Sequence, residues 1–318
     1  MYTLKRCKSN IFTFYATNKY TNTLMKLLKS FLSINTIYLL VLCCYNNGSA
    51  QVIADTLIAS QYFKKGDSLL TQRALDSSLS YFQKALPIYE ASKVWENVAK
   101  CYNQISEYHW RNQEYEQSLK NAKKAIKIST KYLEKEAIQK AYAYDNIGIY
   151  YELAIFDYET ALMYYKKALD LKKRILPKDN IGFSFTFNNI GGIFFKKGEY
   201  DKALEYHQKS LLLKIKKNVQ LAYSYNEIGR VYIAKKAYQK ALQYFKKSLS
   251  IDIKTLGKIN LEVATDFNNI GVAYRGNKEY DKALEYYNKA LDIYIKLYGD
   301  NHVRVSNSYY NIGLIHHA

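Results

Sequence analysis

Asparagine recurs two or three residues before a glycine in this chain, and two arginines follow such glycines. An amide side chain offers two N–H donors and one acceptor oxygen, so a column of asparagines could hold the backbone of an extended peptide. The arginines would favour an acidic peptide. The alternative is that asparagine is a common solvated residue in a sequence biased toward AT-rich codons. The candidate binding residues are Asn146, Asn189, Asn226, Arg230, Asn269 and Arg275.

Signs of catalysis or cofactor binding are missing from the sequence. No HExxH, P-loop, GxSxG or GxGxxG motif occurs. Of the five histidines, His109, His207 and His316 fall on aromatic positions of an internal repeat, which favours packing. Cys101 is the only cysteine after residue 44, so no cysteine-based metal site or internal disulfide is expected there. We expect a protein that is not an enzyme, with no cofactor, no metal and no catalytic residue.

The candidate residues belong to a repeat that organises nearly the whole chain. An Ile-Gly pair recurs with its glycine at positions 148, 191, 229, 271 and 313, in steps of 43, 38, 42 and 42 residues. A leucine recurs with similar steps at positions 79, 119, 162, 204, 242 and 284. The spacing predicts six complete units and a seventh that begins at about Ser306.

Each unit reads as a helical hairpin. In the last complete unit, apolar residues at offsets 0, 3, 4, 7, 10, 11, 14, 17 and 18 from Tyr280 form one stripe of a helix. A first helix ends near the expected turn 277–279. We expect Gly271 to lie where the two helices cross, with Ala283 and Ala290 facing it, because small residues allow close approach.

These residues resemble the tetratricopeptide repeat family. Its pattern of an aromatic residue, Ile-Gly, Tyr, Ala, an aromatic residue and Ala is matched by Phe267, Ile270-Gly271, Tyr274, Ala283, Tyr287 and Ala290. The unit length of about 42 residues and the segment 297–313 are similar to the kinesin-light-chain type. Departures include Ser106 in place of the glycine, His207 in place of an aromatic residue, and a one-residue slip near Thr160.

The resemblance implies an all-α, right-handed α-solenoid of stacked antiparallel helix pairs. First helices line the concave face in this fold, which would place the candidate asparagines and arginines in a groove. The residues of the carboxylate clamp known from chaperone-binding family members are not reproduced. The implied function is a non-enzymatic scaffold that binds a protein or peptide partner in its concave groove.

The net charge of +19 could suggest a nucleic-acid partner. Residues 1–50 carry six of these positive charges and no acidic residue, which leaves +13 on the remaining 268 residues. There the Lys-Lys pairs fall mostly on second helices, as solvated outer faces would. We therefore expect no nucleic-acid partner.

The N-terminal segment is typical of an exported protein. Residues 31–44 form an apolar run of 14 residues, shorter than the roughly 20 that a membrane-spanning helix needs. Lys26 and Lys29 precede the run and Gly48-Ser49-Ala50 follows it. We expect an upstream overextension over 1–24, a signal peptide over 25–50 and a repeat array over 51–318. The mature chain would be periplasmic or extracellular, with no stable membrane span; the alternative is a membrane tether through residues 31–44.

The seventh unit leaves a second function class open. The sequence stops inside the first helix of that unit, whereas solenoids normally end in a polar capping helix. One class is a stand-alone exported scaffold. The other is the N-terminal sensory region of a membrane receptor, such as a histidine kinase or a transcription regulator.

Overall fold

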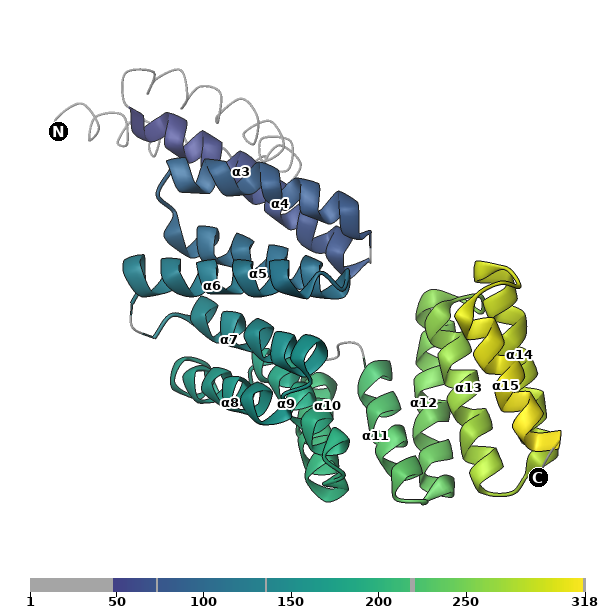
Figure 1. Ribbon diagram of the computed structural model, residues 1–318. Coiled ribbons are helices and arrows are strands. Elements are labelled where there is room, and N and C mark those ends of the chain that lie inside the picture. Colours follow the sequence, from purple (N-terminus) through teal and green to yellow (C-terminus); the bar gives the residue numbers. More distant parts are fainter. Residues whose placement is uncertain (1–47, 73, 135, 218–220, 317–318) are drawn as a thin grey trace, which may run out of the picture.

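The computed structural model describes residues 48–72, 74–134, 136–217 and 221–316 (Figure 1). The segment 1–24 and nearly all of the expected signal peptide lie outside these residues. In chain order the helices are α3 (Gly48–Thr71), α4 (Leu75–Ala91), α5 (Trp95–Arg111), α6 (Tyr115–Tyr132), α7 (Ile138–Tyr150), the π-helix η1 (Tyr151–Ile155), α8 (Tyr158–Ile175), α9 (Gly182–Lys196), α10 (Tyr200–Lys217), α11 (Ala222–Ala234), α12 (Tyr238–Leu256), α13 (Leu261–Gly276), α14 (Tyr280–Tyr298) and α15 (Val303–His316).

The helices pair in the order that the repeat predicts. Six hairpins run from α3–α4 to α13–α14, and α15 is the first helix of a seventh unit. Figure 1 shows the pairs following one another along the array in chain order. The expected all-α solenoid with six complete units and a partial seventh is confirmed.

Short turns with a left-handed residue separate the two helices of a unit. Between α13 and α14, Lys278 adopts a φ of 62°, and the N–H of Glu279 donates to the carbonyl of Tyr274 at 3.0 Å. Gln113, Gly198 and Lys236 take the same conformation in other units. One left-handed residue ends a helix and turns the chain within a few residues.

The third unit accommodates one extra residue through a π-helix. Gly148 and Leu162 are 14 residues apart, whereas the equivalent residues of the next three units are 13 apart. The additional residue is taken up in η1, the last turn of the first helix. Phe156 follows with a φ of 59°. The one-residue slip in the sequence therefore has a local structural cause, since π-turns absorb single insertions within helices.

In the third to sixth units, the repeat glycine lies under a ring of the second helix. A Cβ atom added to Gly271 would lie 2.6 Å from the Tyr287 ring, and one added to Gly229 would lie 2.5 Å from the Phe245 ring. The close approach expected at Gly271 is confirmed. The residue that covers it is Tyr287 rather than the flanking alanines, so the aromatic stripe lies directly on the glycine positions.

In the second unit, the small and the large residue of this contact are exchanged between the two helices. Ser106 stands in place of the glycine, and Ala122 stands where other units carry the ring. The Ser106 hydroxyl donates to the carbonyl of Ser118 at 2.8 Å, and both residues are fully buried. A small residue on α6 makes room for the larger one on α5, which explains this departure from the repeat.

The first helices form the inner side of the stack. α5 contacts α7, and α11 contacts α13, whereas successive second helices do not make comparable contacts. Helices on the inner side of a curved stack approach each other more closely than those on the outer side. The first helices α3, α5 and α7, and likewise α11 and α13, therefore lie side by side on the inner side of the stack.

Candidate peptide-binding face

The six candidate residues all lie on first helices. Asn146 is on α7, Asn189 on α9, Asn226 and Arg230 on α11, and Asn269 and Arg275 on α13. The inner face of the array is defined by residues at offsets −6, −2 and +1 from each repeat glycine, which is one stripe of a helix. On α7, α9 and α11 these residues are Tyr142, Asn146, Ile149, Phe185, Asn189, Gly192, Tyr223, Glu227 and Arg230. Asn226, at offset −3, and Arg275, at offset +4, lie outside this stripe.

Most of the asparagines connect neighbouring first helices. The Asn269 amide donates to the side-chain oxygen of Asn226 at 3.1 Å, and the Asn146 amide donates to the backbone carbonyl of Asn103 at 3.2 Å. Asn311 donates to the side-chain oxygen of Asn268 at 3.0 Å. Each bond spans 43 residues, one repeat. We call this set of bonds the asparagine ladder; it satisfies amide groups at unit junctions.

Asn226 has a second partner in the fully buried Asp266 of α13. Its amide nitrogen donates to Asp266 Oδ1 at 2.6 Å. Burial raises the pKa of the Asp266 carboxyl, and the nearby charge of Asp252 raises it further. The junction between the fifth and sixth units therefore contains two neighbouring carboxyl groups in a poorly hydrated position.

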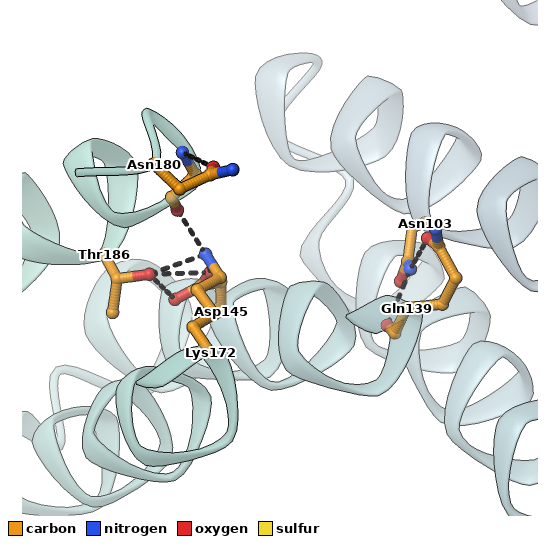
Figure 2. A network of polar contacts seen from close by, with 7 residues as sticks. Asn103, Gln139, Asp145, Lys172, Asn180 and Thr186 are labelled. Carbon is orange, nitrogen blue, oxygen red and sulfur yellow. Dashed lines mark hydrogen bonds and ion pairs between the residues drawn. The ribbon is translucent and has the colours of Figure 1, made fainter. Parts of the chain in front are cut away.

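The ladder is interrupted at α9. Asn189 is the equivalent donor, but its amide nitrogen has no hydrogen-bond partner among the described residues. Asp145 occupies the acceptor position, and it is bonded to Lys172 and Thr186 (Figure 2). Asp145 accepts from these two side chains, and no hydrogen bond joins it to the Asn189 amide.

Asp145 belongs to a buried ionic network between the third and fourth units. Lys172 is fully buried, and its Nζ donates to Asp145 Oδ2 at 2.7 Å and to the Thr186 hydroxyl at 2.8 Å. It also donates to the carbonyl of Gly182 at 2.8 Å. Sequence reasoning missed this network, although Lys172 takes a repeat position that carries Ser129 in an earlier unit and Asp252 in a later one.

Beside Asn189 the inner face is open and aromatic. The Tyr223 and Phe185 side chains are 59% and 39% exposed. A Cβ atom added to Gly192 would meet only Glu152 Oε1, at 3.9 Å, so the backbone there is accessible. The Glu227 carboxylate, together with burial of the hydroxyl, raises the pKa of Tyr223, which keeps that hydroxyl a hydrogen-bond donor.

Charged side chains border this open region in balanced pairs. Arg230 contacts Glu227 at 2.9 Å, and its guanidinium lies 5.2 Å from the centroid of the Phe195 ring. Lys196 contacts Glu152 at 3.0 Å. The Arg230 and Lys196 side chains are 48% and 33% exposed, whereas both carboxylates are 13% exposed, so the cations are the groups that an acidic ligand can reach.

Arg275 lies farther along the array, in the sixth unit. Its Nη1 is buried and has no hydrogen-bond partner among the described residues. The contact of Arg230 with Phe195 joins α11 to α9, the helix that carries Asn189, whereas Arg275 lies apart on α13.

Among the described residues, no group of three or more His, Cys, Asp or Glu side chains could hold a metal ion. None of the helices in the same residues combines the length and apolar character needed to cross a bilayer.

Comparison with known proteins agrees with the repeat architecture. The tetratricopeptide repeat family matches residues 97–174, 184–254 and 262–318, well over half of the chain. No curated protein matches. Many solved structures share the fold, and three of them serve as examples. BtubC (BKLC) from P. vanneervenii has a TM-score of 0.58 at 14% identity and covers 78% of this chain and 92% of its own.

The other two structures have similarly low identity. A Rap protein complexed with competence and sporulation factor has a TM-score of 0.59 at 14% identity, covering 82% of this chain and 75% of its own. Kinesin-light-chain TPR-like repeats of Podosopora anserina have a TM-score of 0.52 at 15% identity, covering 62% and 95%. At such identities the likeness concerns the fold alone. With its repeats, its stacked hairpins and this match, the chain belongs to the tetratricopeptide repeat family.

Proposed function

We propose that this protein is an interaction scaffold that binds an extended segment of a protein or peptide partner on its inner face, centred on α9 and α11. The observation that carries the proposal is the interruption of the asparagine ladder at Asn189. On α9 this unpaired amide donor lies one helical turn from the bare backbone of Gly192, and α11 contributes the exposed ring of Tyr223. The Rap neighbour, solved as a complex with competence and sporulation factor, has the same fold.

The unpaired amide suits the backbone of an extended ligand. A buried donor without an acceptor costs about 1–3 kcal/mol. A ligand carbonyl that reaches the floor of the inner face would give Asn189 Nδ2 its missing acceptor. The absence of a side chain at Gly192 permits the close approach that this bond requires.

The side chains around Asn189 define the rest of the ligand. The Tyr223 and Phe185 rings offer apolar area at little entropic cost, which favours a ligand with an aromatic or aliphatic side chain. Arg230 and Lys196 can pair with acidic ligand groups, while Glu227 and Glu152 can pair with basic ones. The ligand class is therefore an extended, mixed-charge segment with an apolar anchor.

Selection from a displayed peptide library tests this proposal. Peptides selected on the purified chain should bind Tyr223→Ala and Asn189→Ala about tenfold or more weakly, because central anchors dominate binding energy. Asn288→Ala, at an exposed position of the second helix α14, is the matched control and should bind as the parent chain does. Equal affinity for the parent chain and both inner-face variants would discard the inner face as the binding site.

We also propose that the scaffold acts outside the cytoplasm. The support is the charged, apolar and small-residue pattern of residues 25–50. N-terminal sequencing of the exported protein should read from Gln51. Retention of the whole chain with the cell membrane would instead support a tether through residues 31–44.

A further inference from the structure

The third unit contains a carboxylate at a position that other units fill differently. Glu152 follows the repeat glycine Gly148 by four residues, and Tyr165 is the ring that covers this glycine. The Tyr165 hydroxyl donates to Glu152 Oε2 at 2.6 Å, and Lys196 contacts Glu152 Oε1 at 3.0 Å. The Glu152 carboxylate thus accepts from a buried hydroxyl on one side and a cation on the other.

The sixth unit has the same tyrosine without the carboxylate. Tyr287 covers Gly271 and is fully buried, yet its hydroxyl has no hydrogen-bond partner among the described residues. Four residues after Gly271 stands Arg275, whose buried Nη1 also lacks a partner there. Two donors therefore occupy the place where the third unit has an acceptor.

Arg275 lies one helical turn beyond Gly271, which the Tyr287 ring covers, so the two side chains share one face of α13. Burial raises the pKa of the Tyr287 hydroxyl to about 12, while the positive charge of Arg275 acts in the opposite direction. The hydroxyl thus remains protonated at neutral pH and available as a donor. Among the described residues, neither Tyr287 Oη nor Arg275 Nη1 has an acceptor.

We propose that Arg275 and Tyr287 form a binding subsite for a carboxylate, either an acidic side chain or the C-terminal carboxylate of a peptide. A guanidinium can donate two parallel hydrogen bonds to a carboxylate, and a buried hydroxyl adds a third donor. The ligand carboxylate would lie between the Arg275 guanidinium and the Tyr287 hydroxyl, and would accept from that hydroxyl as Glu152 does from Tyr165 in the third unit. The biological use of the subsite rests on the proposed function, for which it would anchor the acidic end of a bound peptide.

The equivalent positions of the intervening units do not offer this chemistry. The fourth unit has Phe195 with His207, and the fifth has Ile233 with Phe245. Neither pair combines a cation with a hydroxyl. The subsite is therefore a property of the sixth unit and not of the repeat in general.

Thermal melting of the full chain in sodium acetate tests the subsite directly. The buffer is held at pH 7, and acetate replaces chloride at constant ionic strength. Acetate should raise the melting temperature of the parent chain relative to chloride, because a ligand that binds only the folded state stabilises it. Arg275→Ala and Tyr287→Phe should lose this increment, and Arg304→Ala, an exposed arginine on α15, should keep it.

Tyr287→Phe keeps the test independent of misfolding. It removes a hydroxyl that has no partner, so in chloride it should melt at or above the temperature of the parent chain. Arg275→Glu would supply a built-in acceptor, as Glu152 does, and should also abolish the acetate increment. Glu152→Ala is the positive control, since it opens an equivalent place beside Tyr165 that acetate should fill.

The inference is overturned if Glu152→Ala responds to acetate while the parent chain does not. It is also overturned if the parent increment survives in both Arg275→Ala and Tyr287→Phe. Peptides selected on the chain separate this inference from the proposed function. Changing a peptide's carboxylate to a carboxamide should weaken binding about tenfold in the parent chain and not in Arg275→Ala. Loss of binding in Tyr223→Ala, without any effect of the carboxamide, would remove the subsite alone.

Discussion

The side-chain amide of Asn269 donates to the side-chain oxygen of Asn226 at 3.1 Å, and so joins α13 to α11 one repeat earlier. Asn311 makes the same bond to Asn268 at 3.0 Å. A recurrent asparagine thus has a role inside the solenoid, where it satisfies polar groups between neighbouring first helices. The unpaired amide of Asn189 is informative because it departs from this arrangement.

Replacing Asn269 should therefore weaken the array more than replacing Asn189. Asn269→Ala removes an inter-unit hydrogen bond and leaves the Asn226 oxygen without that donor, which should cost about 1 kcal/mol in the free energy of unfolding. Asn189→Ala removes the same atoms but no amide-donated hydrogen bond, so it should change stability by less than about 0.5 kcal/mol. Urea denaturation of the two variants makes the comparison. Equal losses would show that the ladder contributes nothing specific.

The glycine positions give a second matched pair. A Cβ atom at Gly271 would meet the Tyr287 ring at 2.6 Å, whereas one at Gly313 meets nothing within 4 Å. Gly271→Leu should destabilise by about 1–3 kcal/mol through overpacking. Gly313→Ala should leave stability unchanged or raise it by up to about 1 kcal/mol, because alanine favours the helix. A Gly271→Leu melting profile identical to that of the parent chain would contradict the close contact seen at this crossing.

The regular part of this fold was predictable because every unit repeats the same packing problem. Ile270-Gly271 and the stripe of α14 identify a helix crossing from spacing alone. The exchange of Ser106 and Ala122 was visible only as a departure, since its compensation joins two helices. Identifying the residue that covers Gly271 also required the structure, because Tyr287 and its flanking alanines lie on the same helical stripe.

The candidate site was predictable only at the level of helices. Recurrence placed the asparagines on first helices but could not tell which amides were already bonded. That distinction involves Lys172, a residue of another helix, whose ammonium donates to Asp145 at the acceptor position opposite Asn189. Nor could spacing show that Tyr287 and Arg275 both lack an acceptor, since that requires knowledge of every atom around them.

The buried network of Lys172 should be sensitive to loss of its acid. Asp145→Ala leaves the Lys172 ammonium buried without its counter-ion, which should destabilise by about 3–5 kcal/mol. Lys173 makes the matched control, because it is exposed and its Nζ lies 3.8 Å from the Asp170 carboxylate. Lys173→Ala should therefore melt close to the parent temperature. A small effect of Asp145→Ala in urea denaturation would mean that water reaches Lys172.

Asp266 should make the array less stable as the pH rises. Its pKa is raised by burial and by Asp252, so between the unfolded and folded pKa values the folded chain binds more protons than the unfolded chain. Stability from this group therefore falls with increasing pH. Asp266→Asn retains an acceptor for Asn226. Relative to the parent chain, it should raise the free energy of unfolding more at pH 8 than at pH 5. Asp281→Asn, at an exposed position of α14, should leave the difference between the two pH values as in the parent chain.

His207 should act in the opposite direction. Its ring covers Gly191, its Nδ1 lies 3.2 Å from the Asn188 side-chain oxygen, and burial lowers its pKa to about 4. Between this folded pKa and the unfolded pKa of about 6.5, the unfolded chain therefore binds more protons than the folded chain. The contribution of His207 to the free energy of unfolding is complete above about pH 6.5, and it declines by up to about 1.4 kcal/mol per pH unit on acidification.

Two exchanges between units isolate this effect. His207→Phe places in the fourth unit the residue that covers Gly229 in the fifth, and it should flatten the decline of the urea midpoint between pH 6.5 and pH 4. Phe245→His is the reverse exchange and should create a new decline over the same range, since its ring position is equally buried. Parallel pH profiles for the parent chain and His207→Phe would mean that the imidazole becomes protonated without cost. The Gly191 contact would then have to open to solvent in acid, and amide hydrogen exchange in α9 and α10 would detect that opening.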